Sequence, residues 1–172
     1  MKLNLTFALG IGVALLTACG SSTGPDTDSM RAAVNQAKMS LARSTVVAQE
    51  SVPDGVAIKA ALIAESKPVF SVGAAGGGAM HEVRIDAVNG AVLSNTQVGA
   101  GADPCPGSIP LPDAIARAEA RAGGVAVQVQ PDDDNECYRE VLVLGDNDQV
   151  WEVKVAQDGA ILEVEEADND GD

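Results

Sequence analysis

Hydrophobic positions along the chain follow the same succession of periods twice, with an offset of about seventy residues. In the second copy they recur every three or four residues, as one face of a helix does, at Leu111, Ala114, Ile115, Ala118 and Ala122. Gly123-Gly124 ends this helix. In the first copy a longer helix is predicted from about Met30 to Ser51, and Pro53-Asp54-Gly55 ends it.

After each predicted helix the hydrophobic period changes to two, which is typical of a strand with one buried face. The alternating positions are Val56, Ile58, Ala60 and Leu62 in the first copy and Val125, Val127 and Val129 in the second. A second strand is expected at 69–72 and at 138–144, and a third at 82–85 and at 152–155. Asn89-Gly90 or Asp158-Gly159 then predicts a hairpin turn before a last short apolar run.

These patterns predict an α+β protein made of two tandem repeats, each with one helix packed on a small antiparallel sheet. The expected repeats span residues 30–98 and 108–167, with a glycine- and proline-rich linker at 99–107 and an acidic tail at 168–172. Periodicity fixes which side chains share a face, but it does not fix how the two repeats dock. Pairing of their edge strands into one continuous sheet is left open.

The N-terminal residues have the pattern of a bacterial lipoprotein signal peptide. A short positive end, Met1-Lys2, precedes an apolar run of about 14 residues, too short for a membrane span. Leu16-Thr17-Ala18-Cys19 follows as a lipobox, so we expect residues 1–18 to be removed and Cys19 to be lipidated. An ordinary signal peptide with an incidental cysteine is the alternative. Residues 19–29 are polar and read as a flexible tether.

The predicted export indicates where the protein is located and how its remaining two cysteines are expected to behave. We expect the chain to be anchored in the cell envelope facing the periplasm, at the outer membrane if the bacterium is Gram-negative, because Gly20 follows Cys19. In an oxidising compartment Cys105 and Cys137 are expected to form a disulfide. A reactive thiol pair is the alternative, although the short Cys-x-x-Cys spacing is absent.

The negative net charge of the chain limits the kinds of molecule that it is expected to bind. The chain carries 11 basic and 25 acidic residues, a net charge of -14, which excludes nucleic acid as a partner. Residues 131–172 hold 15 of the acidic residues against Arg139 and Lys154. Clustered oxygens there make calcium a hypothesis, with Asp132, Asp133, Asp134 and Glu136 as weak candidate ligands. A solvated acidic surface and tail is the alternative, and the tail Asp168-Asn-Asp170-Gly-Asp172 lacks a complete EF-hand loop.

The residues give little support to catalysis. His81 is the only histidine, and its position corresponds to Trp151 in the second copy, which indicates packing or a sheet edge. One histidine and two cysteines that are expected to pair leave no standard zinc ligand set. The glycine-rich segment 73–79 lacks the Lys-Ser/Thr pair of a phosphate loop and is predicted to be a flexible hairpin loop. We therefore expect no enzyme activity and no cofactor.

Several short motifs occur in both copies and resemble the PepSY (peptidase propeptide and YpeB) family over most of residues 37–166. In the first copy they are Ser40-Leu41, Pro53-Asp54-Gly55, Phe70, His81-Glu82-Val83 and the run from Asp86 to Leu93. In the second they are Pro110-Leu111, Gly123-Gly124, Tyr138, Trp151-Glu152-Val153 and Asp158 to Leu162. The resemblance implies inhibition or local regulation of a peptidase and supplies no catalytic residue. His81, Glu82, Glu152 and Asp86 are interpreted as residues that hold strands and turns.

Three functions remain open at this stage. The favoured one is a lipid-anchored, non-catalytic module of the cell envelope that binds and regulates another protein, such as an exported peptidase, through its sheet faces and acidic second repeat. The second is an acidic envelope sensor or buffer for cations such as calcium. The third is a structural lipoprotein without a specific ligand.

Overall fold

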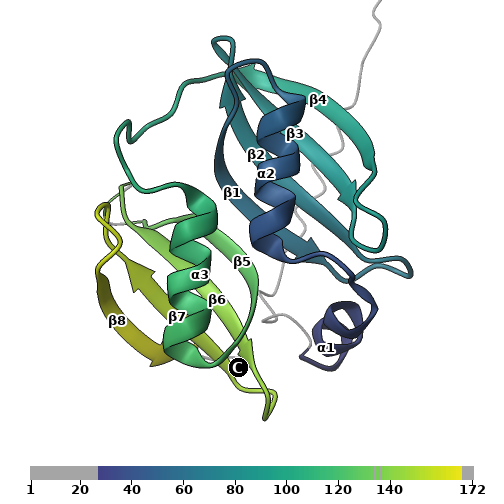
Figure 1. Ribbon diagram of the computed structural model, residues 1–172, viewed down its shortest axis with the longest axis vertical. Helices are drawn as coiled ribbons and strands as arrows, with labels where there is room; N and C mark the ends of the chain where they lie inside the picture. The colour runs from purple at the N-terminus through teal and green to yellow at the C-terminus, as the bar shows by residue number, and fades with distance from the viewer. Residues whose placement is uncertain (1–26, 134, 136, 168–172) are drawn as a thin grey trace, which may run out of the picture.

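The computed structural model describes residues 27–133, 135 and 137–167. Figure 1 shows its three helices and eight strands, which we label along the chain. The helices are α1 (Thr27–Gln36), α2 (Leu41–Ser51) and α3 (Leu111–Ala122). The strands are β1 (Val56–Ile63), β2 (Val69–Gly76), β3 (Ala79–Asp86), β4 (Val92–Ala100), β5 (Gly124–Pro131), β6 (Arg139–Gly145), β7 (Val150–Val155) and β8 (Ile161–Glu166).

All eight strands belong to one antiparallel sheet with the order β4-β3-β2-β1-β5-β6-β7-β8. The expectation of two tandem repeats, each with its own small sheet, is therefore wrong. The strands β1 and β5 meet at the centre, where Ala60 lies opposite Val129 and Ala61 opposite Gln128. An unpaired edge strand leaves its N–H and C=O groups without partners, so this pairing removes an exposed edge from each half of the chain.

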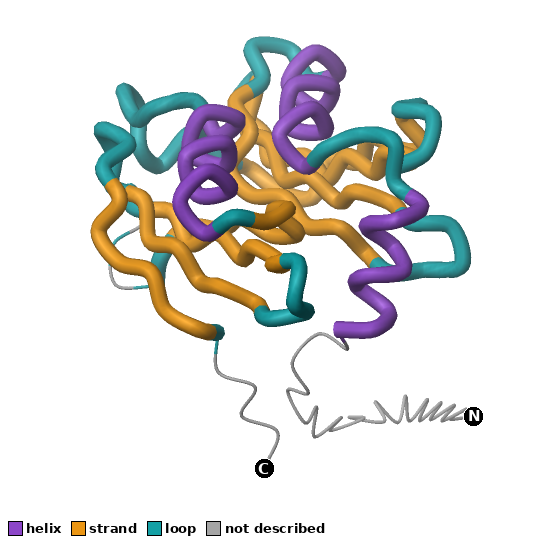
Figure 2. The backbone as a smooth tube through the Cα atoms, turned by 60° about the horizontal axis from the view of Figure 1, so that its bottom comes forward, coloured by secondary structure: helices purple, strands orange, loops and turns teal. Residues whose placement is uncertain are grey.

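A single hydrophobic core lies between the sheet and its helices. Figure 2 shows α2 and α3 side by side above one face of the sheet, and the two helices contact each other. Leu41 of α2 and Ile115 of α3 belong to the same buried cluster as Phe70, Val83 and Val143 of the strands. Because only 2% of the residues are aromatic, the core consists mostly of Val, Ile, Leu and Ala, and a shared core buries more of each side chain than two small ones would.

The first helical segment is broken into two helices, which corrects the single helix predicted from Met30 to Ser51. Ser40 caps the start of α2, where its hydroxyl accepts a hydrogen bond from the Arg43 N–H at 3.2 Å. The N–H groups of Lys38 and Met39 instead donate to the carbonyl of Ala87, at 2.9 and 3.2 Å. The hydrophobic period continues across the break, so periodicity alone could not reveal it.

The helix α1 starts at Thr27, inside the segment predicted to be a tether, and links the two halves of the sheet. Ala33 is buried in the common core. Arg31 forms an ion pair with Asp148, in the turn between β6 and β7, with Nε and Oδ1 2.7 Å apart. The predicted helix in the second half is confirmed as α3, and Gly123 follows it with a φ of 73°, a left-handed conformation that favours glycine.

The segment 73–79 is mostly strand, which corrects the predicted flexible loop. The strand β2 continues to Gly76, and a two-residue turn at Gly77 and Gly78, with φ angles of 58° and 79°, leads into β3. Positive φ at both central residues is the requirement of the tight turn whose twist matches a hairpin. A side chain at Gly76 would lie 2.3 Å from the carbonyl oxygen of Pro53, so glycine is needed there for packing.

Candidate functional site: the uncovered face of the sheet

The structure joins Cys105 and Cys137 by a disulfide, with Cα atoms 5.2 Å apart. Cys105 is buried in the segment between β4 and α3, and Cys137 lies in the loop before β6. The bridge therefore ties the connection between the two halves to the acidic loop of the second half. Cys19, the signal peptide and most of the predicted tether lie outside the described residues.

The acidic loop between β5 and β6 is built around Asp132, whose carboxylate is 2% exposed. One carboxylate oxygen accepts a hydrogen bond from the Asn135 N–H at 2.8 Å, and the other lies 2.7 Å from Nζ of Lys154. The carboxylate of Asp132 is therefore already paired with the ammonium group of Lys154. Asp133 is exposed, while Asp134, Glu136 and the tail 168–172 lie outside the described residues. Within the described ranges no group of three or more His, Cys, Asp or Glu side chains is arranged to hold a metal ion.

His81 and Asp86 hold local structure. Nδ1 of His81 lies 2.8 Å from Oδ1 of Asn95, and Nδ2 of Asn95 donates to the carbonyl of Ser51 at 2.8 Å, so this chain of contacts joins the end of α2 to β3 and β4. One carboxylate oxygen of Asp86 accepts from the N–H groups of Val88 and Asn89 at 2.8 and 3.1 Å. Asp86 thereby closes the turn between β3 and β4.

The strand register changes one pairing that the sequence indicated. Phe70 lies opposite Leu62 and Ile85, and in the second half Arg139 lies opposite Pro131 and Val155. Arg139, and not Tyr138, therefore corresponds to Phe70. It is 7% exposed, and burial lowers the pKa of its guanidinium group while Asp103 acts in the opposite direction. One half thus places an aromatic ring where the other places a cation.

One face of the sheet is left uncovered by the described helices. On the covered face the strands present Val72, Val83, Val129, Val141 and Val153, all 0% exposed. The positions that alternate with them and are half-buried or exposed, together with Gly73, are called the open face here, while Val69, Ala75, Leu144 and Val150 alternate in the same way but are buried. The open-face positions are Lys59, Ala61, Ile63, Ser71, Gly73, Met80, Glu82, Arg84, Ser94, Thr96, Val98, Gln128, Gln130, Glu140, Leu142, Glu152, Lys154, Glu163 and Glu165.

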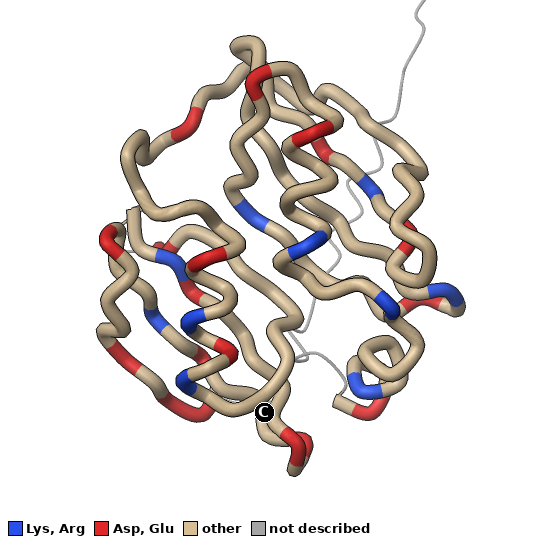
Figure 3. The backbone as a smooth tube through the Cα atoms, in the orientation of Figure 1, with Lys and Arg blue, Asp and Glu red and all other residues tan. Residues whose placement is uncertain are grey.

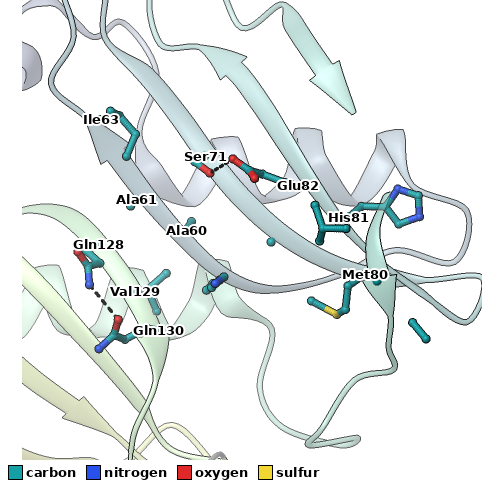
Figure 4. A pocket seen from close by; sticks show the side chains of 15 residues that line it. Ala60, Ala61, Ile63, Ser71, Met80, His81, Glu82, Gln128, Val129 and Gln130 are labelled. Carbon is teal, nitrogen blue, oxygen red and sulfur yellow. Dashed lines mark hydrogen bonds between the residues drawn. The ribbon is translucent and has the colours of Figure 1, made fainter. Parts of the chain in front are cut away.

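A groove with a volume of about 620 Å³ crosses the open face from β4 through β3, β2 and β1 to β5. Ala61 leaves it hollow because its side chain is small, the Lys59 side chain lies over Gly73, and Met80 and Val98 give it an apolar wall. Ser71 donates a hydrogen bond to Glu82 at 3.2 Å on one side, as Figure 4 shows. The volume lies in the range of sites that hold small ligands or single side-chain anchors.

From the groove a hydrogen-bonded row of side chains leads into the second half. Nε2 of Gln128 donates to Oε1 of Gln130 at 3.0 Å, and Nε2 of Gln130 donates to Oε2 of Glu140 at 3.0 Å. Beyond Glu140 the open face carries Glu152 on β7 and Glu163 and Glu165 on β8. We call these four carboxylates the acidic strip. Their only cationic neighbour among the open-face positions of β5–β8 is Lys154, which lies opposite Glu140 and Glu163.

Repulsion within the acidic strip is seen in the pKa of Glu152, at its centre. Partial burial raises the pKa of Glu152 from its ordinary value, and the charges of Glu140 and Glu165 raise it further, while Lys154 lowers it. Glu165 lies directly opposite Glu152 across the β7–β8 pair. Like charges at directly opposite positions destabilise a sheet. The strip would therefore be relieved by a cationic partner.

Sequence reasoning missed the open face, although a signal for it was present. Gln128 and Gln130 alternate with Val127 and Val129, and Glu163 and Glu165 alternate in the same way along the last strand. Period two places such polar residues together on one face. What the sequence could not give was the order β1-β5-β6-β7-β8, which brings them into one row.

Comparisons with known proteins leave the family of this chain open. No family model and no curated protein matches it. A solved structure from Clostridium difficile 630, described as a "putative lipoprotein (CD1622)", is similar with a TM-score of 0.47 and 16% sequence identity, over 76% of this chain and 95% of that one. Among the described residues no helix has both the length and the hydrophobicity that crossing a membrane requires.

Proposed function

We propose that this chain is a lipid-anchored, non-catalytic binding module of the bacterial cell envelope, and that it engages another exported protein through the open face. The observation that carries the proposal is the open face itself: three helices cover one side of an eight-stranded sheet, and the described residues leave the other side bare and acidic on its second half. The lipobox ending in Cys19 supports the anchor, and the resemblance of residues 37–166 to PepSY repeats supports a regulated peptidase as the partner.

Charge distribution supports the second half as the recognition surface. Residues 27–100 contain six acidic and six basic residues, whereas residues 101–167 contain fifteen acidic and four basic ones. Figure 3 shows the acidic residues gathered over β6, β7 and β8. A surface of this kind attracts a basic partner over a range of about 10 Å at moderate salt, and higher salt weakens the attraction.

The test is photocrosslinking in intact cells that carry the lipidated protein. A photoreactive amino acid at Glu163, on the open face, should give a discrete crosslinked product with one envelope protein. The matched control is Glu50, an exposed acidic residue of α2 on the helix side, and it should give no such product. Equal crosslinking from both positions, or none from Glu163, would overturn the proposed binding face.

The anchor has its own test. Cys19→Ser should release the protein from the membrane fraction, because the thiol that accepts the lipid is missing. The same variant should lose the crosslink at Glu163 if the anchor is what holds the module beside its partner. A Cys19→Ser protein that stays with the membranes would contradict the proposed lipidation.

A further inference from the structure

The groove and the acidic strip lie in one line across the open face. The groove reaches from β4 to β5, where Gln128 and Gln130 line its end, and the strip then occupies β6, β7 and β8. The groove is centred on β2, and neighbouring strands are about 4.8 Å apart, so the strip begins about 14 Å from the centre of the groove and ends about 24 Å from it. The two features are close enough for one short ligand to touch both.

We infer that this line is a binding site for an extended peptide that carries one apolar anchor side chain and, a few residues away, basic side chains. The inference rests on the proposed function and names the chemistry of its partner. An extended chain advances about 3.3 Å per residue, so basic residues about four to seven positions from the anchor reach the strip when the anchor fills the groove. The partner is a cationic and apolar segment of an exported protein.

The groove and the acidic strip favour different side chains of a ligand. Ala61, Met80 and Val98 offer apolar surface in the groove, so an apolar anchor loses water there, and the one carboxylate of the lining, Glu82, already accepts a hydrogen bond from Ser71. Lys59 lies at the groove, its side chain passing over Gly73, and it forms no ion pair with a described residue. The groove thus carries one positive charge, on Lys59, and one negative charge, on Glu82, whereas the strip carries four carboxylates beside Lys154. A basic side chain is therefore favoured over the strip, which fixes the order of the ligand.

The raised pKa of Glu152 agrees with this order, because a cation placed over the strip would lower the pKa of that carboxyl again. Glu140, Glu165 and Glu163 surround it on the neighbouring strands, and Lys154 compensates only part of their charge. A lysine or arginine of the peptide would supply the missing positive charge.

The experiment uses the full lipidated chain in nonionic detergent micelles, with empty micelles as the blank, and a fluorescein-labelled peptide. The peptide carries one Leu followed by lysines four and six residues later in a Gly-Ser background. Fluorescence anisotropy should show binding that weakens about tenfold when Leu is replaced by Ser. A peptide with the two lysines replaced by Gln should bind about five-fold more weakly.

Two groove variants and one strip variant test the site on the protein. Ala61→Phe fills the groove and should weaken the peptide about tenfold, and Val98→Ser, at a position 58% exposed, should weaken it less while leaving the fold intact. The double variant Glu152→Gln with Glu165→Gln should lose about five-fold. Asp146→Asn, an exposed carboxylate in the β6–β7 turn, is the matched control and should change nothing.

Several outcomes would overturn the inference. Binding that is equal for the peptide without Leu, or that Asp146→Asn weakens as much as the strip variant does, would mean general charge attraction only. A chain that is dimeric at micromolar concentration and monomeric as Ala61→Phe would assign the groove to a second copy. If the peptide does not bind while the crosslink at Glu163 persists, the module binds its partner by other chemistry. The proposed function then stands, and this peptide site is wrong.

Discussion

The two halves of the sheet share their order of elements and differ in their surface. In each half a helix precedes four antiparallel strands, and β1 and β5 carry a register shift at the same place, next to Ala57 and next to Ala126. Yet the first half has balanced charge, and the second has fifteen acidic residues against four basic ones. The covered faces of the two halves are alike because a helix must pack on each of them. The open faces carry no such packing and can differ.

The two outer edges of the sheet differ in the same way. The strand β4 runs for nine residues without a charged side chain, and Leu93 and Val98 on it are 55% and 58% exposed. The strand β8 carries Glu163, Glu165 and Glu166. Charged residues at an edge prevent other strands from pairing with it, so the second half is protected at its edge by the same residues that make it acidic.

The largest expected effect comes from a substitution in the core that the two halves share. Phe70 is 2% exposed, and Phe70→Ala should lower the free energy of unfolding by about 3–5 kcal/mol. Urea denaturation followed by circular dichroism measures this. Leu93→Ala, on the exposed edge strand, is the control and should change the stability by less than about 0.5 kcal/mol. A Phe70→Ala protein as stable as the control would contradict the common core.

The next effect concerns the bridge that only the second half has. Cys105 and Cys137 close a loop with a sequence separation of 32. The double variant Cys105→Ser with Cys137→Ser should lose about 3–4 kcal/mol, since the unfolded chain gains conformational freedom. Reduction of the unmodified protein should reproduce the loss, and adding the reductant to the double variant should change nothing further.

A smaller effect comes from the ion pair between Lys154 and Asp132. The hydrogen bond to Asp132 raises the pKa of Lys154 above its ordinary value of 10.5, so the pair contributes its full stability below pH 10.5. That contribution is lost as the pH rises through the higher, folded-state pKa. Lys154→Met should therefore lower the melting temperature at pH 8 and flatten its fall at strongly alkaline pH. An unchanged alkaline profile would contradict a role for this pair.

The smallest expected effect comes from Glu152, at the centre of the acidic strip. The pKa of Glu152 is raised above its ordinary value of 4.5, so the folded protein holds this proton more tightly than the unfolded chain does. Stability from Glu152 therefore falls as the pH rises from about 4.5 through the folded-state pKa. Glu152→Gln should raise the melting temperature at pH 7 and remove that part of the pH dependence, whereas Asp146→Asn should leave the profile unchanged.

The sequence predicts local structure here better than it predicts assembly. The alternation around Ala60 and Val129 indicates two strands, and the face Leu111, Ala114, Ile115 and Ala118 indicates α3, because each depends only on neighbours along the chain. The pairing of β1 with β5 depends on contacts between residues about seventy positions apart, and no period of two or 3.6 encodes it. The same limit hid the open face, the groove and the position of Arg139.

The single sheet with its shared core is tested by urea unfolding of the unmodified chain, followed with two probes. Trp151, the one tryptophan of the sequence, lies on β7 and reports on the second half through its fluorescence, while far-ultraviolet circular dichroism reports on all strands and helices. One sheet with one core predicts coincident single transitions, and Phe70→Ala in the first half should shift both to lower urea. Two separate transitions, or a Trp151 signal that Phe70→Ala leaves unmoved, would contradict the single sheet.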